Sequence, residues 1–391
     1  MDNPLEQTTI PGAMEVPITR PALGSEEAAA LVDPLATGWI VQGPKVREFE
    51  RMFCELSGAP HALAATSCTT ALHLALSVLG VGAGDEVVVP SFTYVASANV
   101  VEQCGATTVF VDVDSSTFNM DPAALEAALS PRTRAIMVVH LFGLLADMEP
   151  IMAMAHERGI PVIEDAACAV GSRLDGQHAG TFGDFGAFSF HARKVVTTGE
   201  GGMLTVRDDD QARLASIMRS HGGQVSDLER HRMGAFALPE HDVVGFNYRM
   251  TDLQAALGIV QLGRLDELVG RRREIAAAYD EAFSDLQGVV VPKVPDGAEH
   301  TYQSYVLRLT GEAAMGRDDL AVALQRRGIS TRQGTHAVHF LRYYRRRYGV
   351  AAEDFPHSLD ADRNSLSLPI FPAMTLGEQD YVIAGVRDLL G

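Results

Sequence analysis

The chain has 391 residues, 47% of them apolar and 21% charged, a balance typical of a globular protein with a sizeable buried core. Its 32 basic and 50 acidic residues give a net charge of −18, which argues against a general affinity for nucleic acid or an anionic membrane. Because its four cysteines lack zinc or disulfide spacing and its apolar runs are too short to span a bilayer, we expect a cytoplasmic protein with reduced thiols and no bound metal.

In chain order, two helices come first and are followed by a regular alternation of apolar strands and helices. The first helices are predicted over 25–35, with Ser25 as N-cap, and over 46–57. Strands are then predicted over 62–65, 86–89, 108–111, 135–139 and 161–163, separated by helices over 69–79, 95–103, 122–129 and 148–157. Strands this apolar on both faces indicate a mainly parallel sheet between helices, which binds ligands beyond the carboxyl ends of its strands.

The pattern in the second half of the chain predicts a smaller domain. Two short strands flank Lys194, and a helix over 209–221 precedes a long loop over 222–242. The later pattern predicts helices over 251–268, 274–286 and 317–326 and strands over 289–291, 304–309 and 329–331. We therefore expect a flexible segment over 1–14, a large α/β domain over 15–265 and a smaller α+β domain over 266–391.

Residues suited to a phosphorylated aromatic ligand follow several of these strands. They are the hydroxyls and backbone amides of 67–70 at a helix start, the ring of Tyr94, the acids Glu164 and Asp165, and the amine of Lys194. Each has a plainer explanation taken alone: a helix cap, a packed aromatic residue, a structural ion pair and a solvated lysine. Together they match pyridoxal 5′-phosphate, with the acid on the ring nitrogen and the lysine forming a Schiff base.

Eight stretches carry a resemblance to a known family. They are GWIVQGPKVREFE, ATSCTTALHLAL, GDEVVVPSFTYVASAN, VVHLFG, IEDAACAVGS, FGAFSFHARKVVTTGEGGML, GFNYRMTDLQAALGIVQL and LSLPIFP. Their order over about residues 15–375 resembles that of the DegT/StrS family of pyridoxal-phosphate-dependent sugar aminotransferases. The resemblance implies fold type I, an α/β fold with a mainly parallel seven-stranded sheet between helices and a smaller C-terminal α+β domain.

The resemblance also implies roles for individual residues. Lys194 would form the Schiff base, Asp165 would pair with the pyridine nitrogen, and Tyr94 would stack on the ring. The phosphate would be held by Ser67, Cys68, Thr69 and Ser189, and by Asn247 of a neighbouring subunit, which implies a homodimer with shared active sites.

Two cysteines depart from the family pattern. Many members have glycine where Cys68 stands, and Cys168 occupies a position near the cofactor's ring oxygen that usually holds glutamine or histidine. A small core thiol is the plainer explanation of Cys168. Members that dehydrate sugars replace the lysine with histidine, so Lys194 favours transamination over dehydration.

The expected activity is transfer of an amino group from L-glutamate to a keto sugar, most simply a nucleotide-linked keto-deoxyhexose. A cyclitol or an unlinked keto sugar is the alternative acceptor, and a cofactor-binding regulator without turnover is the alternative class. Candidate substrate contacts are Trp39 in its loop, His191, Arg249, and His336 in the Arg-rich segment 332–348. That segment fits a diphosphate or sugar contact and a solvated charged surface about equally well.

Overall fold

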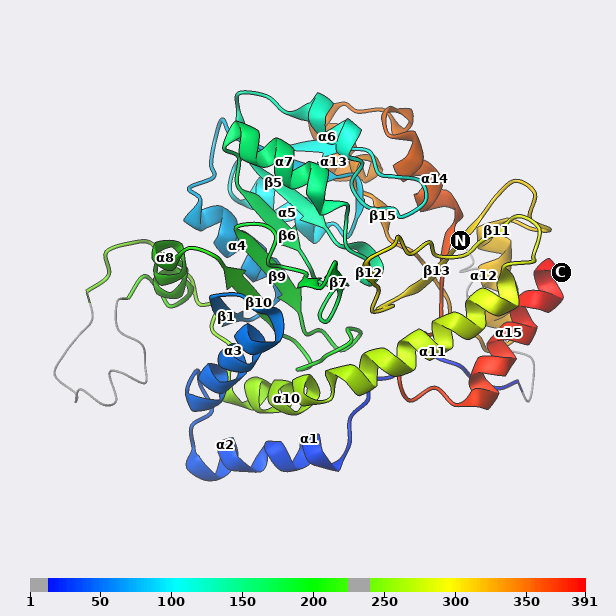
Figure 1. Ribbon diagram of the computed structural model, residues 1–391, viewed down its shortest axis with the longest axis horizontal. Coiled ribbons are helices and arrows are strands. Elements are labelled where there is room, and N and C mark those ends of the chain that lie inside the picture. The colour runs from blue at the N-terminus through cyan, green and yellow to red at the C-terminus, as the bar shows by residue number, and fades with distance from the viewer. Residues whose placement is uncertain (1–12, 224–239) are drawn as a thin grey trace.

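A seven-stranded sheet forms the centre of the computed structural model, which describes residues 13–223 and 240–391 (Figure 1). Neighbouring strands follow the order β1 (His61–Ala65), β10 (Gly202–Val206), β9 (Phe185–Ser189), β6 (Val162–Asp165), β5 (Thr133–Val139), β2 (Glu86–Pro90) and β4 (Thr107–Val111). The pairs from β9 to β4 are parallel, and only β1 with β10 and β10 with β9 are antiparallel. The prediction of a mainly parallel, seven-stranded α/β fold is confirmed.

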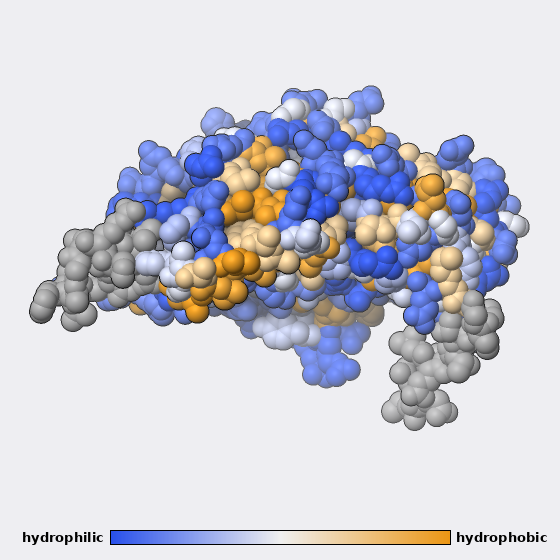
Figure 2. Space-filling model, turned by 90° about the horizontal axis from the view of Figure 1, so that it is seen from below, coloured by the Kyte–Doolittle hydropathy of each residue, from blue (hydrophilic) through white to orange (hydrophobic). Residues whose placement is uncertain are grey.

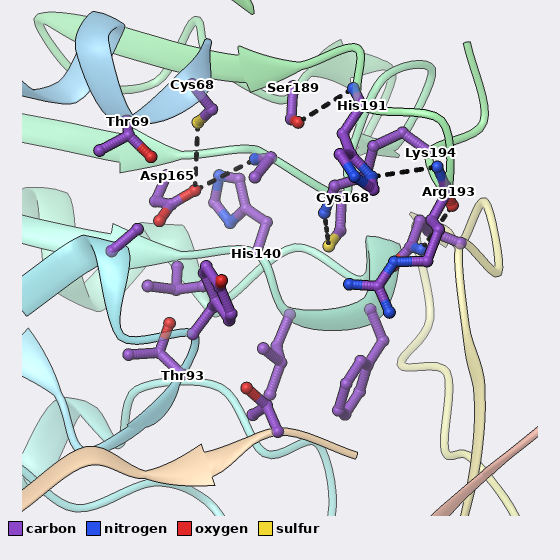
Figure 3. Close-up of a pocket in the computed structure, with 18 of the residues that line it drawn as sticks. Cys68, Thr69, Thr93, His140, Asp165, Cys168, Ser189, His191, Arg193 and Lys194 are labelled. Carbon is purple, nitrogen blue, oxygen red and sulfur yellow. Dashed lines mark hydrogen bonds between the residues drawn. The ribbon is translucent and has the colours of Figure 1, made fainter. Parts of the chain in front are cut away.

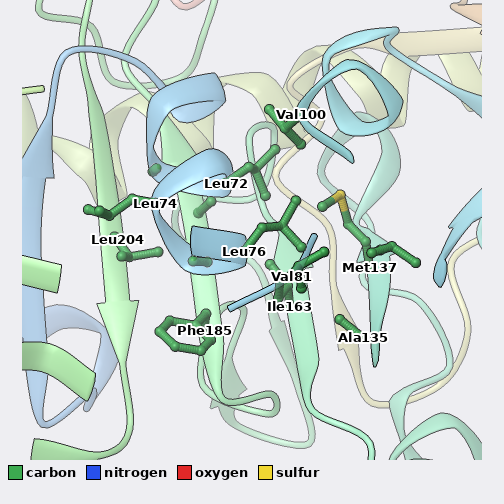
Figure 4. Close-up of a cluster of buried hydrophobic side chains, with 14 of the residues drawn as sticks. Leu72, Leu74, Leu76, Val81, Val100, Ala135, Met137, Ile163, Phe185 and Leu204 are labelled. Carbon is green, nitrogen blue, oxygen red and sulfur yellow. The ribbon is translucent and has the colours of Figure 1, made fainter. Parts of the chain in front are cut away.

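Helices cover both faces of this sheet because successive strand residues point to opposite sides. In β2, Val87 and Val89 pack in one core while Val88 packs in another. The first core, drawn in Figure 4, lies under α4 (Cys68–Val78), α5 (Ala96–Gln103) and α8 (Asp209–Arg219). On the other face lie α3 (Pro44–Ser57), α6 (Pro122–Ala128), α7 (Met148–Arg158) and α10 (Asp252–Gly263).

A second, four-stranded antiparallel sheet organises the C-terminal part. Its order is β11 (Val289–Val290), β13 (Tyr305–Leu309), β16 (Ser365–Leu368) and β14 (Arg332–Gln333). It packs with α11 (Leu265–Phe283), α12 (Arg317–Arg326) and α15 (Leu376–Leu390) in a separate core. The start of α11 packs in the core of the large sheet and its end in this second core, so the helix joins the two parts (Figure 1). The domain boundary near residue 265 stays a prediction.

The remaining elements are short. They are helices α1 (Ser25–Ala30), α2 (Val32–Thr37), α13 (Arg342–Tyr348) and α14 (Pro356–Asn364), and strands β3 (Phe92–Thr93), β7 (Arg173–Leu174), β8 (Gln177–His178), β12 (Ala298–Glu299) and β15 (His336–Ala337). Within the described ranges, no helix has the length and apolar character needed to cross a membrane.

Several element predictions are wrong in detail, among them the single helix predicted over 251–268, which is broken at Arg264 between α10 and α11. The helix predicted over 25–35 is two helices, because Pro34 has no N–H to donate to the carbonyl of Ala30. The gap predicted over 269–273 is helical, since an ion pair between Arg271 and Glu274 and the burial of Arg272 hold the turn around Gly270. The strand predicted over 329–331 forms at 332–333 instead, and most of the predicted loop over 222–242 lies outside the described residues.

Candidate active site

A cavity of about 440 Å³ opens beyond the carboxyl ends of the central strands (Figure 3). This volume lies in the range of sites that enclose a small ligand. The structure brings most of the predicted site residues together in its lining: Ser67, Cys68, Thr69, Tyr94, Asp165, Cys168, Ser189, His191 and Lys194. They come from the ends of β1, β6 and β9 and from the segments that follow β3 and β9.

One wall of the cavity is the N-terminus of α4. Ser67 is its N-cap, and the first intrahelical bond runs from the Ala71 N–H to the Ser67 carbonyl at 3.1 Å. The N–H groups of Cys68 and Thr69 precede that bond and therefore have no acceptor within the helix. Together with the helix dipole they make this end suitable for an anion.

Gly202 allows β10 to approach this helix end closely. A Cβ atom at this position would lie 2.3 Å from the carbonyl carbon of Ser67 and 2.6 Å from the amide nitrogen of Cys68. Gly202 also pairs with Ser189 on β9, whose side chain is buried and lines the cavity. The close contact places the Ser189 hydroxyl on the same side of the sheet end as the amides of Cys68 and Thr69. We call these three groups the anion cradle.

Asp165, the last residue of β6, lies in the cavity wall with its carboxylate held on both oxygens. Ser97 donates to Oδ2 at 2.7 Å, and the amide of Ala167 donates to Oδ1 at 3.2 Å. The thiol of Cys68 lies 3.7 Å from Oδ1, and burial together with Asp165 raises the pKa of that thiol well above its usual range. Cys68 is therefore a neutral thiol at pH 7, and Asp165 is the acid available to a cationic ligand.

Lys194 lies in the turn after β9, and its Nζ is 3.0 Å from the sulfur of Cys168. The turn is fixed by a bond from the Lys194 N–H to the carbonyl of His191 at 2.8 Å. Burial lowers the pKa of Lys194, but the contact with Cys168 and the nearby Asp165 carboxylate raise it by more, so the net shift is upward. The amine is thus positioned inside the cavity and carries a proton until a ligand or base removes it.

Two polar features of the site were missed from the sequence. Ser97 is fully buried behind the cavity wall, where its hydroxyl reaches Asp165, and the only signal in the sequence was its spacing of one helical turn from Tyr94. His140 also lines the cavity; its Nε2 lies 2.8 Å from Glu164, and its Nδ1 accepts from the Ala146 amide at 3.2 Å. His140 is therefore a neutral imidazole that donates to Glu164.

Glu164 and Asp165 are successive residues of β6 and point to opposite sides of the strand, so each has a separate environment. Glu164 is completely buried and accepts bonds from the amides of Gly180 and Gly183 at 2.7 and 2.6 Å. Its partners all come from the segments that pack beside β6, so it fixes the end of the strand. Asp165, the next residue, faces the cavity.

Four predicted residues do not line the cavity. Trp39 packs on Gly43, and its indole donates to the Gln42 carbonyl at 3.3 Å. His336 lies in β15, paired with Thr93 of β3. Asn247 is exposed and bridges to Ser220, while Arg249 bridges to Ala65, close to the start of α4. The cavity of one chain therefore forms without them.

The Arg-rich segment 332–348 divides between two places. Gly334 and Thr335 line the cavity, whereas the hydroxyl of Tyr348 accepts from the amide of Thr108, near the amino end of the parallel strand β4. That end lies opposite the carboxyl ends where the cavity opens. The arginines of α13 therefore lie away from the cavity, as a charged outer surface.

Known proteins resemble this chain over almost its full length. The model of the DegT/DnrJ/EryC1/StrS aminotransferase family matches residues 21–387. The spore coat polysaccharide biosynthesis protein SpsC of Bacillus subtilis (strain 168) is 40% identical over 377 residues, which are 96% of this chain and 97% of SpsC.

Solved structures share the fold. The aminotransferase TlmJ of Streptoalloteichus hindustanus is 36% identical with a TM-score of 0.87, covering 95% of this chain and 98% of TlmJ. Spr1654 of Streptococcus pneumoniae, solved in a PLP-form, is 30% identical with a TM-score of 0.89, covering 97% and 100% of the two chains. The same protein was solved in a PMP-form.

These matches confirm the predicted family resemblance and the predicted fold. They also confirm the prediction of a pyridoxal-phosphate-dependent transaminase, with which the lysine, the acid and the anion cradle of the cavity agree. The chain belongs to the DegT/DnrJ/EryC1/StrS aminotransferase family.

Proposed function

We propose that this protein transfers an amino group from L-glutamate to the keto group of a sugar, most simply a nucleotide-linked keto-deoxyhexose. The observation that carries the proposal is the position of Lys194 Nζ inside a cavity that also presents Asp165 and the N-terminus of α4. The role in polysaccharide biosynthesis for which SpsC is named supports a sugar as acceptor.

The residues of the cavity fit pyridoxal 5′-phosphate. The phosphate would be held by the amides of Cys68 and Thr69 and by the hydroxyls of Ser67 and Ser189, at the cradle that a Cβ on Gly202 would fill. Asp165 would pair with the ring nitrogen, and the exposed ring of Tyr94 would cover one face of the cofactor. When bound, this cofactor supplies an electron-withdrawing ring that stabilises negative charge on the carbon next to the transferred nitrogen.

Lys194 performs two tasks in this proposal. Its Nζ would hold the cofactor covalently between turnovers, and it would carry the proton that moves when the amino group changes carrier. Ser97 and the Ala167 amide keep the Asp165 carboxylate oriented throughout. Cys168 lies within contact distance of Nζ and orients the amine in the unlinked enzyme.

A homodimer with shared active sites is part of the proposal. Leu23, Val32, Leu35, Ile40 and Val41 are exposed large apolar residues. They come from or adjoin α1 and α2, on the lower edge in Figure 1, and Figure 2 shows apolar residues gathered on that side of the molecule. Gathered apolar side chains of this kind fit the interface of the proposed dimer. The exposed Asn247 would then reach the phosphate in the cavity of the partner subunit.

The acceptor is tested by separating the two half-reactions. The protein would first be incubated with L-glutamate, so that it takes up the amino group, and then freed of excess donor. It would next be mixed with a nucleotide-linked keto-deoxyhexose, an unlinked keto sugar or a keto cyclitol. Mass spectrometry would then identify the aminated product. Product from the nucleotide-linked sugar alone supports the proposal, and product from the cyclitol or the unlinked sugar alone contradicts it in favour of the alternative acceptors.

A further inference from the structure

Arg193 is a cation in the cavity to which the proposed reaction has assigned no task. Its side chain is exposed and lines the cavity, and Figure 3 shows the guanidinium extending inward, on the side of the turn where Cys168 and Lys194 lie. Across residues 13–223 and 240–391, no carboxylate forms an ion pair with it. What sets Arg193 apart from other arginines without an acidic partner is its place in the lining of the cavity, next to Lys194.

The backbone around Arg193 is fixed, although its guanidinium is free to bind. The Arg193 N–H donates to Nδ1 of His191 at 3.2 Å, and its carbonyl accepts from the side-chain amide of Gln303 at 3.1 Å. Gln303 belongs to the C-terminal part and lines the same cavity. Since Lys194 is the next residue, both side chains extend from one fixed backbone turn, and both line the cavity.

The other charged groups near Arg193 do not neutralise it. Asp165 is held by Ser97 and the Ala167 amide, and Glu200 lies 3.8 Å from His191. On the side of the C-terminal part, burial and repulsion from Arg193 lower the pKa of Arg332, so a second positive charge is near. This side of the cavity is therefore electropositive and suited to an anionic substrate group.

We propose that Arg193 binds the distal carboxylate of the amino donor and so selects a dicarboxylic amino acid; this inference rests on the proposed function. A carboxylate and a guanidinium form paired, charge-assisted hydrogen bonds. Arg193 and Lys194 both line the cavity, so a dicarboxylic amino acid can place its amino group at Lys194 and its distal carboxylate at the exposed guanidinium. A phosphate of the acceptor has the same charge chemistry but lies farther from the reacting carbon, and separate measurement of the two half-reactions distinguishes the two sources.

The test compares Arg193→Gln with the wild-type holoenzyme in the donor half-reaction, followed by the loss of the visible cofactor band. We expect the half-saturating concentration of L-glutamate to rise about tenfold or more, since one charge-assisted hydrogen-bonding partner is lost. L-2-aminobutyrate, which lacks the distal carboxylate, should react equally with both proteins. Arg193→Lys should restore part of the glutamate affinity. Arg213→Gln, on the exposed surface of α8, is the matched control and should change nothing.

A second readout does not depend on turnover. Calorimetric binding of glutarate and butyrate to the holoenzyme should show a preference for glutarate that falls about tenfold in Arg193→Gln. The inference is overturned if the preference for glutarate is unchanged in the variant. It is also overturned if the variant impairs the reaction with L-2-aminobutyrate as much as that with L-glutamate, or if it impairs only the acceptor half-reaction. The wild-type protein could instead bind glutarate but consume no amino acid, while Arg193→Gln no longer binds glutarate. That result would contradict the proposed function and support the carboxylate site.

Discussion

Asp165 is the acid on which the charge balance of the cavity depends, because Glu164 is satisfied by His140 and two backbone amides. Replacing it by asparagine keeps the shape and the acceptor for Ser97 but removes the negative charge. We expect Asp165→Asn to slow the reaction with L-glutamate by about 100-fold or more, the size of effect seen when a preorganised electrostatic contact is removed. The measurement is the rate at which L-glutamate bleaches the visible cofactor band.

Asp210→Asn is the matched control for this substitution, since the Asp210 side chain is 90% exposed on α8. It should leave the rate unchanged. A wild-type rate in Asp165→Asn, in a variant that binds cofactor normally, would remove Asp165 from the proposed mechanism.

Cys168 controls the protonation of the lysine in the unlinked enzyme. Its sulfur lies 3.0 Å from Lys194 Nζ, and a hydrogen bond to the charged amine favours the protonated form. Cys168→Ala should therefore lower the pKa of Lys194. Because the neutral amine reacts with the cofactor's aldehyde, cofactor uptake by the apoenzyme should reach its half-maximal rate at lower pH than in the wild type. A midpoint that stays in place or moves to higher pH contradicts the assigned contact.

At the scale of elements, the close approach of β10 to the N-terminus of α4 forms the anion cradle. A methyl group on Gly202 would collide with the backbone of Ser67 and Cys68, so one of the two elements must shift. We expect Gly202→Ala to lower the free energy of unfolding by about 1–3 kcal/mol and to weaken cofactor binding. Urea unfolding and titration with the cofactor measure the two effects.

Gly270→Ala provides the control for this prediction. Gly270 lies within α11, and a Cβ there would meet no atom within 4 Å. The free energy of unfolding of Gly270→Ala should stay the same or rise by up to about 1 kcal/mol, since alanine favours the helix. If Gly202→Ala and Gly270→Ala had the same free energy of unfolding and the same cofactor affinity, the close approach of β10 to α4 would be contradicted.

Element positions followed from the sequence where hydrophobic periodicity and caps agreed. The strand ending at Asp165 and the helix capped by Ser67 lie close to where the pattern predicts them. The helix break before Pro34 and the continuous helix through Gly270 did not follow, because a missing backbone donor decides the first and the burial of Arg272 on the packed face of α11 decides the second. Propensity averaged along a segment does not locate such a position, since one proline or one buried side chain acts at a single turn.

At the scale of the whole molecule, two buried histidines make stability depend on pH. Burial lowers the pKa of His178 to about 4 and that of His300 to about 3. Each uses a ring nitrogen as acceptor, His178 from the Gly171 amide and His300 from the Tyr302 amide. The unfolded chain therefore binds more protons than the folded protein below the ordinary histidine pKa of about 6.5.

The free energy of unfolding should consequently be highest above that pKa. It should decrease as the pH falls toward the pKa values of the two histidines in the folded protein. Each histidine contributes up to about 1.4 kcal/mol per pH unit to this loss. Urea unfolding at pH 7, 6 and 5 gives the slope, which should be smaller in His178→Gln and unchanged in His156→Gln, an exposed control. A slope that His178→Gln leaves intact would contradict the assignment.

The cavity shows how far the site could be predicted from the sequence. Residues at strand ends, such as Asp165 and Lys194, were predictable because the ends of parallel strands converge. Ser97 and His140 were not, since their contacts depend on how α5 and β5 pack beside β6. Asn247 lies outside the cavity of its own chain, and its role in a partner subunit stays a prediction.

The most direct test of the central claim is the visible absorption of the purified protein with pyridoxal 5′-phosphate, before and after L-glutamate, beside Lys194→Ala. We predict a yellow band in the wild type that fades with L-glutamate. In Lys194→Ala the cofactor should stay bound without the covalent link, and turnover should be absent. A wild-type band that ignores L-glutamate would indicate another donor or a cofactor-binding regulator, and full turnover in Lys194→Ala would contradict the role given to this lysine.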